Sequence, residues 1–168
     1  MNTNNFEIER KYLIEYPSAG LLALCSDRSD IMQTYLIRTQ PDVNERVRKR
    51  EWSDHTVYTY TRKKRLNEIR RIELEDEIGE AEYGELLARA MPDRSVIYKK
   101  RYILDYRDQH FEIDVYPFWS DRAIMELELL SEEQKILFPP DIRIIKEVTT
   151  DRRYTNASFA AEIPYDIL

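Results

Sequence analysis

The amino-acid sequence predicts an α+β protein dominated by strands, in which about eight antiparallel strands close into a barrel. We expect this barrel to be a tunnel with a polar, charged lumen and flanking helices. Three observations lead to this prediction. Alternation with a period of two residues recurs along the chain, which is typical of strands. The connections between the alternating stretches are short, as expected for antiparallel neighbours. Charged residues also gather on one face of nearly every predicted strand.

The pattern places eight strands and four short helices along the chain. The strands are expected at residues 6–14, 31–38, 43–52, 56–64, 70–78, 95–105, 110–117 and 122–130. The helices are expected at residues 18–25, 80–90, 131–138 and 152–161. Ser131 followed by two glutamates suits a helix start, and Pro139-Pro140 would end that helix. Closure of the strands into a barrel would leave no exposed sheet edges.

The parity of each residue assigns its face, because successive side chains of a strand point to opposite sides. The first strand has two acids and a base on one face, which are Glu7, Glu9 and Lys11. The third has a face of three arginines, Arg46, Arg48 and Arg50. The fourth has Thr59, Thr61 and Lys63 on one face. Apolar residues such as Ile8 and Val47 lie on the opposite faces.

The later strands continue this separation of charged and apolar faces. The fifth strand carries three acids on one face, Glu73, Glu75 and Glu77. The sixth carries two bases, Lys99 and Arg101. The last two carry acids only, which are Glu112 and Asp114, then Glu126 and Glu128. The opposite faces of these strands are apolar or aromatic.

Any one of these charged faces could be the solvated outer face of an ordinary sheet. The sorting of charge sign by strand argues against that interpretation, because single-sign strands forgo cross-strand pairing and place like charges near one another. Clusters of one sign are unfavourable unless a metal or an anionic ligand neutralises them. We therefore expect the charged faces to line the barrel and the apolar faces to pack outward against the helices.

Composition limits the possible functions. The 168 residues suit a single domain, residues 1–168, and carry 32 acidic against 26 basic residues, for a net charge of −6. This balance argues against a broadly basic nucleic-acid binder. Three glycines and the absence of both GxxxxGK[ST] and GxGxxG exclude a glycine-rich phosphate loop. A phosphate ligand would have to be held by side chains.

Other features of the sequence predict a soluble protein that does not use covalent catalysis. Cys25 is the only cysteine, so neither an intramolecular disulfide nor a cysteine-based metal site is expected. His55 and His110 have no visible triad partners. No apolar run reaches the roughly 18 residues of a membrane span, and the N-terminus lacks a signal-peptide pattern. We expect a cytoplasmic protein with no membrane partner; a homodimer is compatible with the sequence, which does not locate its interface.

The two kinds of charge suggest complementary chemical roles. Paired carboxylates are hard oxygen ligands suited to Mg²⁺ or Mn²⁺, and the candidates are Glu7, Glu9, Asp114, Glu126 and Glu128. Basic side chains offer donors to phosphate oxygens, and the candidates are Lys11, Arg46, Arg48, Lys63, Lys99 and Arg101. Hydrolysis of a phosphoanhydride bond, with two metal ions, fits this combination. Glu75 could act as general base, although a metal-bound hydroxide alone would also serve.

Glu7-Ile8-Glu9-Arg10-Lys11 has the spacing ExExK. In this motif the sequence resembles the CYTH, or triphosphate tunnel metalloenzyme, family, of which ExExK is the signature. Further motifs follow in the order expected for the family and cover nearly the whole chain. They are Arg46-Val47-Arg48, Thr61-Arg62-Lys63, Arg71-Ile72-Glu73-Leu74-Glu75, Lys99-Lys100-Arg101-Tyr102, Glu112-Ile113-Asp114, Glu126-Leu127-Glu128 and Lys146-Glu147-Val148-Thr149.

The resemblance implies an eight-stranded antiparallel tunnel that binds a triphosphate with Mg²⁺ or Mn²⁺. It places the candidate carboxylates on the metal side and the candidate bases on the phosphates. Glu73 and Glu75 match acidic tunnel positions; we count Glu73 with the substrate-binding residues, and Glu75 and Lys11 with the catalytic ones.

Several activities are compatible with this resemblance. The short chain has no large insertion that could cover a nucleobase, which favours hydrolysis of inorganic tripolyphosphate to pyrophosphate and phosphate. Class IV adenylyl cyclase and thiamine or nucleoside triphosphatase are the alternatives. A non-catalytic polyphosphate-binding module is a further one, but a pure anion binder gains nothing from so many acids. Aromatic residues such as Tyr98, Tyr102, Tyr116 and Trp119 could stack on a base, although we expect them in the core.

Overall fold

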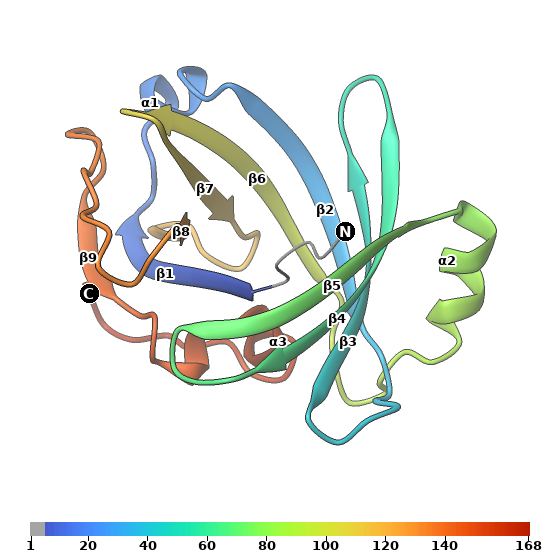
Figure 1. Ribbon diagram of the computed structural model, residues 1–168. Helices are drawn as coiled ribbons and strands as arrows, with labels where there is room; N and C mark the ends of the chain where they lie inside the picture. Colours follow the sequence, from blue (N-terminus) through green and yellow to red (C-terminus); the bar gives the residue numbers. More distant parts are fainter. Residues whose placement is uncertain (1–5) are drawn as a thin grey trace.

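The computed structural model describes residues 6–168, whose strands form one antiparallel sheet that closes into a barrel (Figure 1). The strands are β1 (Phe6–Glu15), β2 (Asp27–Tyr35), β3 (Val43–Glu51), β4 (Thr56–Arg65), β5 (Arg70–Ile78), β6 (Ile97–Tyr106), β7 (Gln109–Val115), β8 (Arg122–Leu129) and β9 (Ile144–Glu147). Their order is β5-β4-β3-β2-β6-β7-β8-β1, and a further pairing of β5 with β1 closes the eight-stranded ring. The predicted barrel is confirmed.

The way in which the barrel closes at β1 explains the ninth strand, β9, which was not predicted from the sequence. One edge of β1 pairs with β8 from Ile8 to Glu15. The other edge pairs with β5 only near its start, where Glu7 faces Arg71. The short strand β9 pairs with the same edge further along, from Tyr12 to Ile14. The edge that β5 leaves open is thereby covered, as expected for a sheet without exposed edges.

The outward faces of the barrel carry its main hydrophobic core, as predicted. Alternate residues of β6, β7 and β8, including Leu104, Phe111 and Met125, pack together in a buried cluster. Leu21 of α1 (Ala19–Ala23) covers part of this cluster. A second, smaller group packs β3 against α2 (Glu80–Leu87) through Val47 and Tyr83.

One end of the lumen is apolar and filled. Leu13 and Ile124 face each other across β1 and β8 on the lumen side, and pack with Tyr116 and Trp119. Phe159 of the short helix α3 (Asn156–Phe159), which follows a 3-10 turn at Arg152–Tyr154, completes this cluster. Figure 1 shows α3 across one end of the barrel. The charged lining therefore occupies the rest of the lumen.

The aromatic residues that could have stacked on a base are mainly structural. Tyr116 and Trp119 are buried in the cluster that fills the apolar end of the lumen, which we call the apolar plug. Tyr102 is buried in the hydrophobic core on the outward face of the barrel. Tyr98 differs from the prediction, because it is 53% exposed.

The helix predicted at residues 131–138 is wrong. This segment is a short turn followed by chain without regular secondary structure. Gln109 explains the difference, because its side chain donates to the carbonyl of Leu137 (2.8 Å) and accepts from the Leu137 amide (3.1 Å). These bonds replace helical ones and hold Phe138 edge-on against Tyr12. Tertiary contacts outweighed the local capping signal.

Smaller differences concern element boundaries. The second strand begins at Asp27 and ends at Tyr35, earlier at both ends than predicted. The helix predicted at residues 152–161 is divided between the 3-10 turn and α3. Within residues 6–168, every helix is too short or too polar to cross a lipid bilayer.

The buried carboxylate of Glu45, on the outer face of the barrel, binds the segments next to β3 through hydrogen bonds. Glu45 is 1% exposed and accepts hydrogen bonds from the Thr39 amide (2.6 Å), the Tyr60 hydroxyl (2.5 Å) and the Arg89 guanidinium (2.6 Å). Burial by itself would raise the pKa of Glu45, but these bonds outweigh burial and lower it from 4.5 to about 2. The charged form is therefore stabilised in the folded protein.

We expect Glu45→Gln to lower the free energy of unfolding by about 2–3 kcal/mol at neutral pH. The folded pKa lies below the unfolded one, so this stabilisation is complete above pH 4.5 and is lost as the pH falls toward 2. Urea unfolding across this range measures the difference. Glu51→Gln, at the exposed end of the same strand, is the control. An equal loss in both variants, or a loss independent of pH, would contradict the prediction.

Candidate active site

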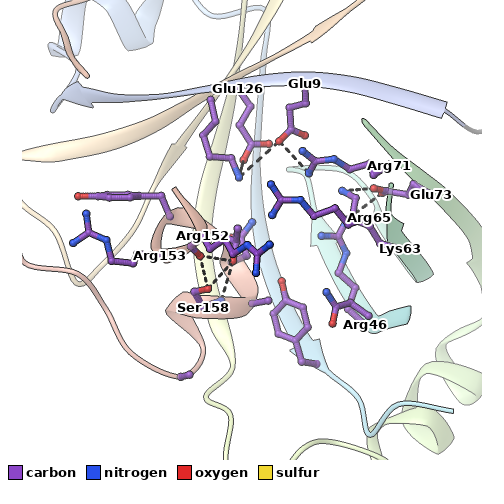
Figure 2. A pocket seen from close by; sticks show the side chains of 18 of the residues that line it. Glu9, Arg46, Lys63, Arg65, Arg71, Glu73, Glu126, Arg152, Arg153 and Ser158 are labelled. Atoms are coloured by element: carbon purple, nitrogen blue, oxygen red, sulfur yellow. Dashed lines mark hydrogen bonds and ion pairs between the residues drawn. The ribbon is translucent and has the colours of Figure 1, made fainter. Parts of the chain in front are cut away.

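The strand register brings the predicted site residues to one face, the lumen. Four cross-strand pairs carry this arrangement: Glu9 with Glu128, Lys11 with Glu126, Lys63 with Glu73, and Arg101 with Asp114. A cavity of about 1560 Å³ occupies the lumen and its mouth (Figure 2). Of the predicted residues, all but Asp114 line this cavity: Glu7, Glu9, Lys11, Arg46, Arg48, Lys63, Glu73, Glu75, Lys99, Arg101, Glu126 and Glu128.

Two acidic strands, β5 and β7, pair with basic strands, whereas β7 and β8, both acidic, also pair with each other; one step of the sequence interpretation is therefore corrected in part. We had expected single-sign strands to forgo cross-strand pairing. Instead, the acids of β5 lie beside the bases of β4, and the acids of β7 beside the bases of β6. The sequence shows the sign of each strand but not its neighbour, and the neighbour decides whether charges pair or repel. The lumen-facing assignment itself was right.

The β3–β5 side of the lumen holds three ion pairs that a phosphate could compete for. Arg46 lies 3.3 Å from Glu73, and Lys63 forms a close ion pair with the same carboxylate. Arg48 donates to both oxygens of Glu75, at 3.0 and 3.1 Å. Burial, followed by the nearby Arg46, lowers the pKa of Arg48 to about 10. Arg48 nevertheless stays charged at neutral pH.

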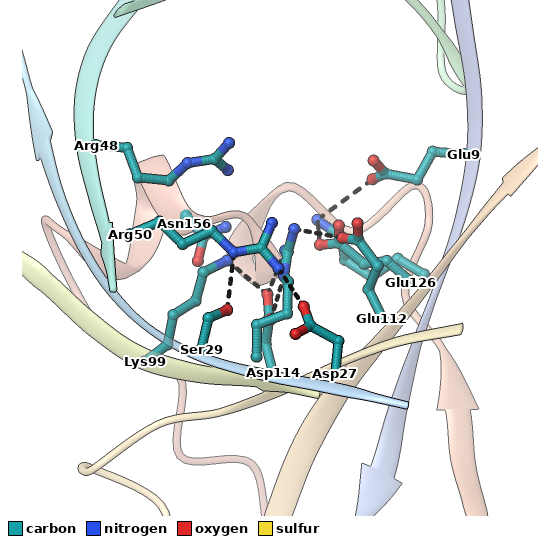
Figure 3. Close-up of polar contacts among 12 residues, drawn as sticks. Glu9, Asp27, Ser29, Arg48, Arg50, Lys99, Glu112, Asp114, Glu126 and Asn156 are labelled. Carbon is teal, nitrogen blue, oxygen red and sulfur yellow. Dashed lines mark hydrogen bonds and ion pairs between the residues drawn. The ribbon is translucent and has the colours of Figure 1, made fainter. Parts of the chain in front are cut away.

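The most deeply buried ion pairs centre on Asp114, whose side chain is 1% exposed (Figure 3). Both of its oxygens accept from Arg101, at 2.8 Å each, and Lys99 lies 2.5 Å away. Burial and the adjacent Arg101 lower the pKa of Lys99 to about 8. Asp114 thus lies behind the cavity surface with both oxygens engaged by bases. Its role as a metal ligand stays a prediction.

Carboxylates concentrate on the β1–β8 side of the lumen. Glu9 faces Glu128 directly, and Glu112 faces Glu126. Lys11 lies between them, 3.0 Å from Glu126 and 3.7 Å from Glu9. Burial would raise the pKa of Glu126, but Lys11 and Arg101 outweigh it and hold this pKa well below 4.5. Like-charged neighbours in a partly buried site are unfavourable without a cation between them.

Glu7 shows the same crowding. Burial, together with the nearby carboxylates of Glu73 and Glu128, outweighs the opposing effect of Lys63 and raises the pKa of Glu7 from 4.5 to about 7. Among residues 6–168, acids, histidines and cysteines form no ready-made cluster of three around one point. The donor set nevertheless fits Mg²⁺ or Mn²⁺, because Glu7, Glu9 and Glu128 offer only oxygen ligands from neighbouring positions of β1 and β8.

Three charged residues of this lining were not predicted to have a role in the site. Glu112 lies 2.5 Å from Arg101, and Arg71 lies 3.4 Å from Glu9. Arg50 continues the row of Arg46 and Arg48, where it donates to Ser29 and Asp27. Parity had placed Arg50 and Glu112 on the charged faces. Arg71 has the same parity as Glu73, so the same rule would have found it.

Comparison with known proteins identifies the family. No protein-family model matches the chain. It is 34% identical over 161 residues to the inorganic triphosphatase of Nitrosomonas europaea, covering 94% of this chain and 99% of the relative. The chain belongs to the CYTH, or triphosphate tunnel, family. Within this family it is an inorganic triphosphatase-like hydrolase.

Solved structures support the placement in the triphosphate tunnel family. A crystal structure of an inorganic triphosphatase is 31% identical, with a TM-score of 0.59, over 98% of this chain and 99% of that one. A putative adenylate cyclase from Bacillus halodurans is 16% identical with a TM-score of 0.54, over 77% of this chain and 84% of that one. The second likeness shows only that the fold is shared. Enzymes of this family are generally metal-dependent.

Proposed function

We propose that this protein hydrolyses inorganic tripolyphosphate to pyrophosphate and phosphate with the help of Mg²⁺ or Mn²⁺. The observation that carries the proposal is the two-sided lumen, where bases of β3, β4 and β6 face carboxylates of β1 and β8 across one cavity. The near full-length similarity to an inorganic triphosphatase supports it. A pure anion receptor would not need the carboxylate side.

The basic residues would bind the phosphates by exchanging partners. Arg46 and Lys63 form ion pairs with Glu73, and Arg48 forms one with Glu75. A phosphate chain offers the same guanidinium and ammonium groups more acceptor oxygens at higher charge. Lys11, between Glu9 and Glu126, would place a positive charge where the metal side meets the phosphates. This position suits stabilisation of the charge that develops during bond cleavage.

The carboxylates Glu7, Glu9, Glu126 and Glu128 would hold the metal ions. A divalent ion bound there supplies charge neutralisation on the phosphate oxygens and lowers the pKa of a bound water. Water adds to the terminal phosphorus, the bridging P–O bond breaks, and pyrophosphate leaves with the bond's electrons. The protein's part is to align the chain for in-line attack.

Glu75 is our candidate for the group that orients or deprotonates the water. Arg48 and the Thr61 hydroxyl (2.8 Å) hold its carboxylate in place. Its side chain is 34% exposed on the cavity, so water can reach it. Both oxygens already accept hydrogen bonds, so Arg48 would have to turn toward a phosphate before Glu75 could take up a proton. Substrate binding would thereby prepare the base.

Phosphate release from tripolyphosphate is expected to require Mg²⁺ or Mn²⁺, and Glu9→Ala is expected to abolish most of it. The reason is that the substitution removes the carboxylate that lies opposite Glu128 on the metal side. A phosphate assay with and without a chelator measures this result. Parallel assays with ATP and thiamine triphosphate, including cyclic AMP formation, test the alternative substrates.

The matched control for Glu9→Ala is Glu15→Ala, an exposed glutamate at the other end of the same strand. It is expected to retain full activity. If the wild-type protein released no phosphate from tripolyphosphate with either metal, the proposed function would be refuted. Full activity of Glu9→Ala would refute the role of Glu9 alone.

A further inference from the structure

The basic residues at the mouth of the lumen differ from those in its interior in whether they have an acidic partner. Inside, each base named above lies near a carboxylate. At the mouth, Arg38, Lys64, Arg65 and Arg152 line the same cavity, and none lies within ion-pair distance of an acid in residues 6–168. Residues 1–5 contain no acidic side chain. Four basic residues without an ion-pair partner in the described chain thus gather at this opening of a protein with a net charge of −6, and two acids, Asp42 and Glu162, line the same cavity.

Arg65 and Arg152 come from separate segments and approach the same space. Arg65 ends β4, and Arg152 begins the 3-10 turn before α3. Figure 2 shows them on facing sides of the cavity. Within the described part of the chain, residues 6–168, Arg65 donates only to backbone carbonyls, those of Asn67 (2.8 Å) and Glu68 (3.0 Å). Burial lowers the pKa of Arg65, and the positive charges of Arg152 and Arg71 lower it further. Such crowding is unfavourable without an anion.

The position of Arg65 relates it to the phosphate-binding row. It lies two residues beyond Lys63 on the lumen face of β4, about 7 Å further along the strand. The cavity volume of about 1560 Å³ also exceeds the roughly 300–1,000 Å³ typical of small-molecule sites. The basic lining therefore continues past the proposed triphosphate position toward the opening.

We propose that Arg65 and Arg152 form an outer anion site, which holds the additional phosphates of a linear polyphosphate longer than the triphosphate bound inside. This inference rests on the proposed function, because it assumes that the lumen holds the chain end. The ligand is a continuous phosphate chain, which places further charged groups at regular spacing along the same path. Bidentate guanidinium groups suit such phosphates.

The double variant Arg65→Gln/Arg152→Gln tests this site. Calorimetry in metal-free buffer compares binding of linear chains of three, four and more phosphates. The wild-type protein is expected to bind the longer chains more tightly than tripolyphosphate. The double variant should lose this preference, with about tenfold weaker binding of long chains and unchanged binding and turnover of tripolyphosphate. Arg143→Gln, an exposed arginine that does not line the cavity, should behave as the wild type.

Three results would overturn the inference: no preference of the wild-type protein for longer chains, equal loss for short and long chains, or no loss in the double variant. Because binding is measured without turnover, failure of the outer site can be distinguished from failure of the proposed hydrolysis. A protein that binds long chains through these arginines but hydrolyses no tripolyphosphate would refute only the proposed hydrolysis. Hydrolysis without length-dependent binding would refute only the outer site.

Discussion

Replacement of Asp114 by Asn is expected to lower the free energy of unfolding by about 3–5 kcal/mol. Asp114 is the shared partner of Lys99 and Arg101, and the side chains of all three are almost completely buried. A neutral amide cannot compensate the two positive charges, which would remain in a poorly solvated site. Removal of one member of a buried ion pair is much more costly than loss of an exposed one. Denaturant unfolding measures the loss.

The control is Asp93→Asn, because Asp93 forms an exposed ion pair with Arg94. It is expected to change stability by less than about 0.5 kcal/mol. Metal affinity of Asp114→Asn, measured by titration on the folded protein, separates the two roles considered for Asp114. A stable variant with greatly weakened metal binding would show that Asp114 acts as a ligand and that the buried ion pairs are dispensable.

Lys11→Ala is expected to lower kcat for tripolyphosphate about 10²–10³-fold, the usual effect of removing one preorganised charge from the transition state. Lys11 is 8% exposed and lies between the carboxylates of Glu9 and Glu126. No other base lies within ion-pair distance of Glu126 among residues 6–168. Steady-state kinetics with saturating metal measure the change.

The control for Lys11→Ala is Lys100→Ala, an exposed lysine of β6 that does not line the cavity. Its activity should equal that of the wild type. Because Lys11→Ala leaves Glu126 without its partner, thermal unfolding must accompany the kinetics, and Lys11→Ala/Glu126→Gln removes both charges. An unchanged kcat in a folded Lys11→Ala protein would exclude the proposed role.

The barrel and the lining were predictable because they depend on local patterns. Alternation along a strand follows from backbone geometry, so parity alone placed Glu9, Arg48 and Lys63 on a common face. The ExExK signature and the ordered motifs added the family. The helix predicted at residues 131–138 failed for the opposite reason. Its local signals were sound, but the side chain of Gln109, distant in sequence, offered the backbone other partners.

By itself, the sequence determined which residues share a face, the sign of charge on each strand and the resemblance to tunnel enzymes, since all three are periodic or local properties. Only the tertiary structure decided which strands are neighbours. Neighbours determine that Asp114 is enclosed by Lys99 and Arg101, that an apolar plug ends the lumen, and that Arg65 meets Arg152 at the mouth. Coulomb energy and desolvation depend on distance and burial in space, which the order of residues along a chain does not specify.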